Sequence, residues 1–201
     1  MRSRTIALAI SALISALLLA GCAQQDSMGG MSHGSNPTPS SGASSDANAA
    51  DRMFVMMMIP HHEQAIEMAE LLLEKEGVDT RAVDLARQIK EAQQPEIETM
   101  KGWLQAWGIP YDDSMMSGGM GGMEHGGMMS QEDLDALRSA TGTGATRMFL
   151  EGMIAHHQGA IDMARSVIDN GRDSDVRALA EQMIETQAAE ITEMQELLSG
   201  L

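Results

Sequence analysis

Apolar residues recur every three to four positions in four long segments of the chain, with polar residues between them. That spacing places the apolar side chains on one face of an α-helix. It predicts helices over about 52–76, 79–107, 145–170 and 173–198. Residues that commonly begin or end helices flank these segments: Asp51, Gly77, Asp79, Gly108, Gly171 and Asp173.

Two further signals complete the pattern. Ser130-Gln131-Glu132-Asp133 resembles a capping box and predicts a short helix to about Ala140. The preceding stretch, 112–129, is dominated by Met and Gly and predicts a mobile loop, because few helices tolerate so many glycines. Aromatic residues make up only 2% of the chain, and strands favour aromatic and β-branched residues. The fold is therefore expected to be all-α.

The four long helices form two copies of one unit. Residues 53–69 match 148–164 at a spacing of 95, and 87–100 match 181–194 at a spacing of 94. Each pair of helices has one apolar stripe that it cannot bury alone, so two hairpins, 52–110 and 145–200, are expected to pack together. The prediction is a single four-helix bundle over 52–201.

The N-terminal segment predicts an export signal. Arg2 and Arg4 precede a largely apolar stretch of fifteen residues, 6–20, which is too short for an ordinary membrane span, and Leu19-Ala20-Gly21-Cys22 resembles a bacterial lipobox. We expect residues 1–22 to end in cleavage before Cys22 and lipid attachment to its sulfur. Residues 23–51, rich in Ser, Gly, Ala and Pro, then form a disordered tether between the lipid and the bundle.

Charge and cysteine content exclude several classes of function. The formal net charge of −16 opposes binding to nucleic acid, whose phosphates require a basic surface. Cys22 is the only cysteine, which excludes zinc-finger, iron–sulfur and blue-copper sites. Twenty methionines remain as the abundant soft ligands.

Tandem histidines dominate each copy of the repeat. His61-His62 and His156-His157 hold four of the six histidines, and each pair has methionines at helical spacing on the same broad face. Imidazole and thioether together favour a soft metal, copper first. A single methionine at helical spacing usually fills a core, so both packing and ligation stay open for Met58, Met68, Met153 and Met163.

Helices two and four carry further candidates. Met100 and Met194 end the matched stretch and can complete a site across a hairpin. Glu96 and Glu190 lie one turn earlier, either as partners for an imidazole N–H or on a solvated face. The Met/Gly-rich loop adds secondary candidates, which metal gathering and plain low complexity explain equally well: Met120, Met123, His125 and Met128.

The motif Met-x-x-His-His-x-x-Ala-x-x-Met-Ala, followed by Gln-x-x-Glu-Ile-x-x-Met, resembles the domain-of-unknown-function 305 family. Those proteins are ferritin-like helical bundles of the bacterial envelope that have been implicated in copper binding and resistance. The resemblance covers about 51–200. It implies metal-binding roles for Met58, His61, His62, Met68, Met100, Met153, His156, His157, Met163 and Met194.

The leading hypothesis is a non-enzymatic copper-binding lipoprotein of the cell envelope that holds Cu(I) in preference, accepts Cu(II) and silver, and meets the membrane through Cys22. A di-iron enzyme is disfavoured because no histidine is preceded by Glu at three positions. A Met-rich interaction or oxidant-scavenging module explains the methionine excess but not the register of the histidines. Homo-oligomerisation stays open.

Overall fold

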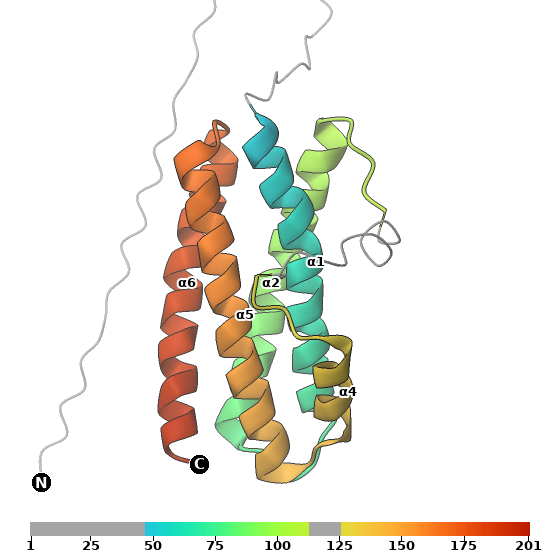
Figure 1. The fold of residues 1–201 in the computed structure, drawn as a ribbon, viewed down its shortest axis with the longest axis vertical. Coiled ribbons are helices and arrows are strands. Elements are labelled where there is room, and N and C mark those ends of the chain that lie inside the picture. The colour runs from blue at the N-terminus through green and yellow to red at the C-terminus, as the bar shows by residue number, and fades with distance from the viewer. Residues whose placement is uncertain (1–46, 113–125) are drawn as a thin grey trace, which may run out of the picture. The chain divides into compact units, whose positions relative to one another are not determined.

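The computed structural model describes residues 47–112 and 126–201, and every regular element within them is a helix (Figure 1). The elements are α1 (Ala49–Leu73), α2 (Thr80–Ala106), α4 (Gln131–Ser139), α5 (Gly142–Asn170) and α6 (Ser174–Ser199). The all-α prediction is confirmed. The signal segment, the lipidation site Cys22 and most of the predicted tether lie outside the described residues.

The start of α1 differs from the prediction. Asn48, not Asp51, is the N-cap, and its side chain accepts hydrogen bonds from the backbone N–H groups of Ala50 and Asp51. Asp51 completes a capping box by accepting from the Asn48 N–H at 2.7 Å. The helix therefore begins three residues earlier than the apolar pattern indicates, and it also ends earlier, with Glu74 as C-cap instead of Gly77.

The other predicted boundaries hold within a few residues. Asp79 caps α2, Ser130 forms a capping box at α4, and Asp173 caps α6. Gly108 follows α2 with φ +69°, a left-handed conformation that favours glycine. Only α5 begins early, at Gly142, and its N-cap Thr141 makes no side-chain capping bond.

Hydrogen bonds between helix ends establish the directions of the helices. The Asn48 side chain donates to the Asn170 carbonyl, which joins the start of α1 to the end of α5. The Asp79 N–H donates to the Thr146 hydroxyl, which joins the start of α2 to the start of α5. The hairpins α1–α2 and α5–α6 thus pack through α1 and α5, with α2 parallel to α5, and α4 lies in the single long crossover between them (Figure 1).

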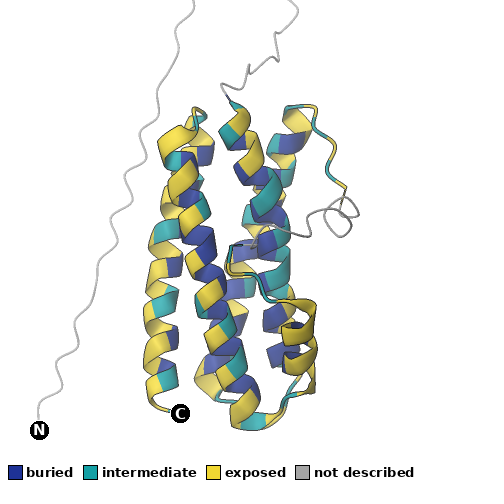
Figure 2. Cartoon of the chain, in the orientation of Figure 1, coloured by how far each residue is buried: buried dark blue, intermediate teal, exposed yellow. Residues whose placement is uncertain are grey.

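Buried residues face inward from all four long helices (Figure 2). They form two apolar clusters. One surrounds Phe149 and Leu72, and the other surrounds Phe54 and Ile97. Between them, midway along the bundle, every long helix contributes buried or half-buried polar side chains. No described helix has both the length and the hydrophobicity needed to cross a membrane.

Asp51 ties the two hairpins together. Its carboxylate is fully buried and accepts hydrogen bonds from the backbone N–H groups of Arg172 and Asp173, in the turn before α6. A Cβ on Gly171 would lie 2.3 Å from the Asp51 carboxylate, so this close approach requires glycine there. Gly171 is the C-cap of α5, as predicted, and its φ of −76° shows that the lack of space for a side chain, not a left-handed backbone, requires glycine there.

Replacement of Asp51 by Ala should lower the free energy of unfolding by about 2–4 kcal/mol, because it leaves several backbone donors without partners. The matched control is Asp84→Ala. Asp84 forms only an exposed ion pair with Arg87, so that change should cost less than about 0.5 kcal/mol. Urea denaturation followed by circular dichroism measures both values. Equal losses would contradict the bridging role of Asp51.

Candidate metal centre

The two histidine pairs, 95 positions apart in the sequence, meet where α1 packs against α5. The ring centroids of His61 and His156 lie 3.7 Å apart, so these two imidazoles are in contact. The neighbouring rings follow on either side, with centroids 6.4 Å apart for His61–His62 and 6.3 Å for His156–His157. We call these four residues the histidine cluster. All four are buried, which places the repeated motif at the centre of the molecule.

Each outer imidazole of the cluster is held by a carboxylate. His62 Nε2 lies 2.8 Å from Glu96 of α2, and His157 Nε2 lies 2.7 Å from Glu190 of α6. The hypothesis that these glutamates accept from an imidazole N–H is thereby supported over a solvated face. Because an ionised carboxylate only accepts, the bond puts the hydrogen on Nε2 and leaves the lone pair of a neutral ring on Nδ1.

The inner imidazoles are less satisfied. His61 Nε2 donates to the carbonyl oxygen of Gly126 at 3.0 Å, whereas neither ring nitrogen of His156 has a hydrogen-bond partner. The Nδ1 atoms of His61, His62 and His157 are also buried without partners. Buried polar atoms are nearly always paired, so a concentration of unpaired nitrogens needs an explanation. Lone pairs that a metal ion would occupy provide one.

Burial keeps the inner imidazoles neutral. It lowers the pKa of His61 to about 3, although the bond to Gly126 opposes the shift and the neighbouring His62 and His157 add to it. The pKa of His156 is also well below its ordinary value, again mainly through burial and then through the adjacent histidines. Neutral imidazole is the form that binds a metal ion.

Methionines flank the cluster on both sides, and the fold distributes them across the two copies. Met58 and Met100 belong to the apolar cluster around Phe54, where the half-buried Met163 packs. Met153, Met194 and Met68 belong to the other. The repeat suggests that the methionines of each copy accompany the histidines of the same copy. Instead, Met58 of the first copy lies on the same side of the histidine cluster as Met163 of the second. Met153 of the second copy lies on the other side, with Met68 of the first.

Carboxylates do not complete a metal site at the histidine cluster. Among the described residues, no group of three or more His, Cys, Asp or Glu side chains has an arrangement that holds a metal ion. The glutamates are directed to the outer nitrogens of His62 and His157, so they stay beyond the cluster. The methionines of the two apolar clusters are the remaining candidate donors that the sequence analysis predicted, and thioethers favour a soft metal.

Sequence reasoning missed the segment 126–129, which we call the strap. The side chain of Gln64 donates to the Met129 carbonyl and accepts from the Met129 N–H, which fixes the strap on α1. A Cβ on Gly159 would lie 1.4 Å from the Gly126 carbonyl oxygen, so α5 admits the strap only at glycine. Residues 126–129 are not helical, in keeping with the predicted loop, but their packing against α1 and α5 was not predicted. Of the secondary candidates, Met128 lies in the strap, and Met120, Met123 and His125 lie outside the described residues.

Two buried glutamines were also missed. Gln93 and Gln187 are 3% exposed, and the side-chain oxygen of each lacks a hydrogen-bond partner. They precede Glu96 and Glu190 by three residues and so lie one turn away on the same helices. The Gln-x-x-Glu motif could have identified these glutamines in the sequence, because it occurs at the same place in both copies.

Comparison with known proteins matches this arrangement to one family. The family model described as "Domain of unknown function (DUF305)" matches residues 51–198. The structure of a DUF305 fragment from Deinococcus radiodurans is 33% identical with a TM-score of 0.66, and the match covers 77% of this chain and 99% of that one. A DUF305 protein from Streptomyces coelicolor, named as a "putative secreted protein", is 29% identical with a TM-score of 0.67. That match covers 78% of this chain and 94% of the other.

CopM is a further structural relative. Its Cu(II)-bound form is 35% identical with a TM-score of 0.65, and the match covers 75% of this chain and 96% of CopM. CopM has also been solved in Cu(I)-bound and Ag-bound forms, which are 33% and 34% identical to this chain. No curated protein matches the chain.

The stability of the protein should fall as the pH falls below about 6.5. The unfolded chain protonates His61 and His156 near their ordinary pKa of 6.5, whereas the folded chain resists protonation of His61 down to about pH 3. The unfolded state therefore binds more protons in this window, and each residue should lower the free energy of unfolding by about 1.4 kcal/mol per pH unit. Urea denaturation at pH 7, 6 and 5 measures the slope, and His61→Gln should reduce it by about half. A flat profile would contradict the buried, neutral state.

Proposed function

This chain belongs to the DUF305 family, and on that premise we propose that it is a non-enzymatic copper-binding lipoprotein of the cell envelope. It would sequester copper or hand it over, holding Cu(I) in preference and accepting Cu(II) or silver. The observation that carries the proposal is the histidine cluster, whose unpaired imidazole nitrogens lie between two apolar clusters that contain the methionine thioethers.

The donor set supports copper in both oxidation states. Thioethers are soft and favour Cu(I), while imidazole nitrogens suit Cu(II) as well. Because His61 and His156 are neutral in the folded protein at ordinary pH, metal binding to them displaces no proton. The proposed ligands are Met58, His61, His62, Met68, Met100, Met153, His156, His157, Met163 and Met194. CopM, which binds Cu(II), Cu(I) and Ag in its solved forms, supports this choice of ions.

The finer features rest on sequence and connectivity. The lipobox around Cys22 supports anchoring to a membrane, and the proposed secretion of the Streptomyces coelicolor relative agrees with an extracytoplasmic location. The single crossover between two hairpins supports the ferritin-like classification. Burial of five of the six flanking methionines, all but Met163, disfavours the alternative of a Met-rich interaction surface for this part of the chain, because a buried thioether cannot contact a partner.

Loss of the two inner imidazoles should abolish tight copper binding. The variant His61→Gln/His156→Gln keeps polar side chains of similar size in the layer. Its Cu(I) affinity should fall by at least about 100-fold, since changes outside the ligand shell alone cost about 10- to 100-fold. Anaerobic titration of residues 23–201 against a competing Cu(I) chelator measures the affinity, and circular dichroism checks the fold.

The chain provides the matched control, because its two other histidines, His33 and His125, do not belong to the repeated tandem motif. His33→Gln/His125→Gln removes the same number of imidazoles and should leave the tight affinity unchanged. If both double variants bind copper as the unmodified chain does, the cluster is structural and the proposed function is wrong.

The thioethers should determine the preference for oxidation state. Met58→Leu/Met100→Leu keeps apolar volume but removes two sulfurs. Its Cu(I) affinity should drop on the order of tenfold or more, and its Cu(II) affinity should change little. Met183→Leu is the control, because Met183 is buried in the same apolar cluster and is not a proposed ligand. An equal effect of the two variants on Cu(I) would indicate that the sulfurs only pack.

A further inference from the structure

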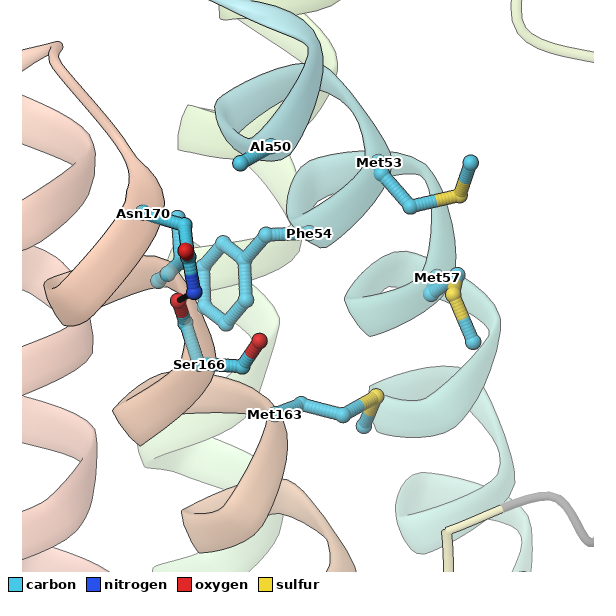
Figure 3. Close-up of a pocket in the computed structure, with 8 residues that line it drawn as sticks. Ala50, Met53, Phe54, Met57, Met163, Ser166 and Asn170 are labelled. Carbon is cyan, nitrogen blue, oxygen red and sulfur yellow. Dashed lines mark hydrogen bonds between the residues drawn. The ribbon is translucent and has the colours of Figure 1, made fainter.

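A cavity of about 310 Å³ opens between α1 and α5, near the start of α1 (Figure 3). Three thioethers line it, those of Met53 and Met57 from α1 and Met163 from α5. Figure 3 shows Met163 reaching from α5 toward α1, where Met53 and Met57 lie one turn apart. The other lining side chains are apolar or uncharged: Ala50, Phe54, Ser166, Val167 and Asn170.

Packing does not account for Met53. Its side chain is 53% exposed, and it is the one large apolar residue with such exposure among the described residues. Residues four apart on a helix have Cβ atoms about 5–6 Å from each other, so the sulfurs of Met53 and Met57 can reach a common point. Methionine is unbranched with three rotatable bonds, so rotation of the side chain can reposition its sulfur.

The lining determines which ion fits. Hard cations such as Mg²⁺ and Ca²⁺ take oxygen ligands, usually with carboxylates among them, and the described lining of this cavity has none. Three neutral thioethers instead favour a soft cation. Because the lining carries no charge, a monovalent ion needs less compensation than a divalent one when it leaves water.

The internal repeat provides an independent comparison. It relates Met53, Met57 and Met163 to Met148, Gly152 and Met68. At that second place the strap supplies the missing sulfur, because a Cβ on Gly152 would lie 2.9 Å from the Met129 sulfur and 3.4 Å from the Met68 methyl. Met148 and Met129 also line one cavity.

Thioethers thus gather at the corresponding place in both copies, although different residues complete the set and Asp133 and Glu151 also line the second cavity. Met57 belongs to α1 and Met129 to the strap, so the two residues are not equivalent in the repeat. Duplication of one packing residue therefore does not explain why a methionine lies at this place in both copies. The strap partly covers the thioethers of the second copy, whereas the cavity at Met53 is open.

The open cavity also adjoins the histidine cluster. A Cβ on Gly126 would lie 3.7 Å from the Met163 methyl, and the Gly126 carbonyl accepts the hydrogen bond from His61. We propose that Met53, Met57 and Met163 form a separate surface site for one soft monovalent cation, Cu(I) or Ag(I), through which the ion reaches the buried cluster. This site shares the class of metal with the proposed function but, apart from Met163, none of its ligands.

Methionine methyl NMR tests the site directly. The full chain, in mild detergent and labelled with ¹³C at the methionine methyl groups, is titrated with silver nitrate in chloride-free buffer. The Met53 and Met57 methyl signals should shift at the first additions. In native mass spectrometry, Met53→Leu/Met57→Leu should bind one Ag(I) fewer than the unmodified chain.

Met56→Leu is the matched control, because Met56 is a partly buried neighbour on α1 that does not line the cavity. It should retain the full number of bound ions. Met53 and Met57 signals that stay unshifted at saturation, or an unchanged ion count in the double variant, would overturn the proposal. The Met58 and Met100 signals report the buried cluster separately, so its failure to bind would be seen independently of this site.

Discussion

A layer of buried polar groups crosses the middle of an otherwise apolar bundle, and the rest of the structure is arranged around it. An unpaired buried polar atom costs about 1–3 kcal/mol, and this layer contains several, on His61, His62, His156 and His157. Apolar clusters above and below the layer, with Phe54 in one and Phe149 in the other, offset that cost by burying most of the large apolar side chains. The layer therefore destabilises the folded state. A bound ion would reduce this cost, because the lone pairs of the imidazoles would then have a partner.

The internal repeat explains how such a layer is built from one motif. Because α1 and α5 run antiparallel, a motif present once on each helix brings His61 onto His156 and sends the methionines before and after the pair to opposite sides. Glu96 and Glu190 hold the outer rings in the same way in both halves. The strap breaks this symmetry: Gly126 accepts from His61, and neither nitrogen of His156 has such a partner.

Helix periodicity, capping residues and the repeat were enough to predict the number and approximate bounds of the long helices and their pairing in hairpins. They were also enough to identify Glu96 and Glu190 as candidate imidazole partners, since a one-turn offset is a local property. Contacts between distant segments were not predictable. The burial of Asp51 depends on the turn before α6, and the position of the strap depends on Gly159, which reads as an ordinary small residue in a helix. The crosswise grouping of the methionines depends on helix direction, which no local pattern records.

The placement of charge around the cluster gives the most direct physical reason for a soft metal. Carboxylates are abundant in this acidic chain, yet the two nearest the cluster bond the outer nitrogens of His62 and His157 and are occupied there. A hard divalent ion at the centre would find neutral nitrogen and sulfur in place of the oxygens it prefers. A soft ion finds donors that match it and carries less charge into the buried layer when it is monovalent. In the proposed site, selectivity would follow from holding the carboxylates on the far side of the imidazoles, where they orient the rings and do not bind the ion.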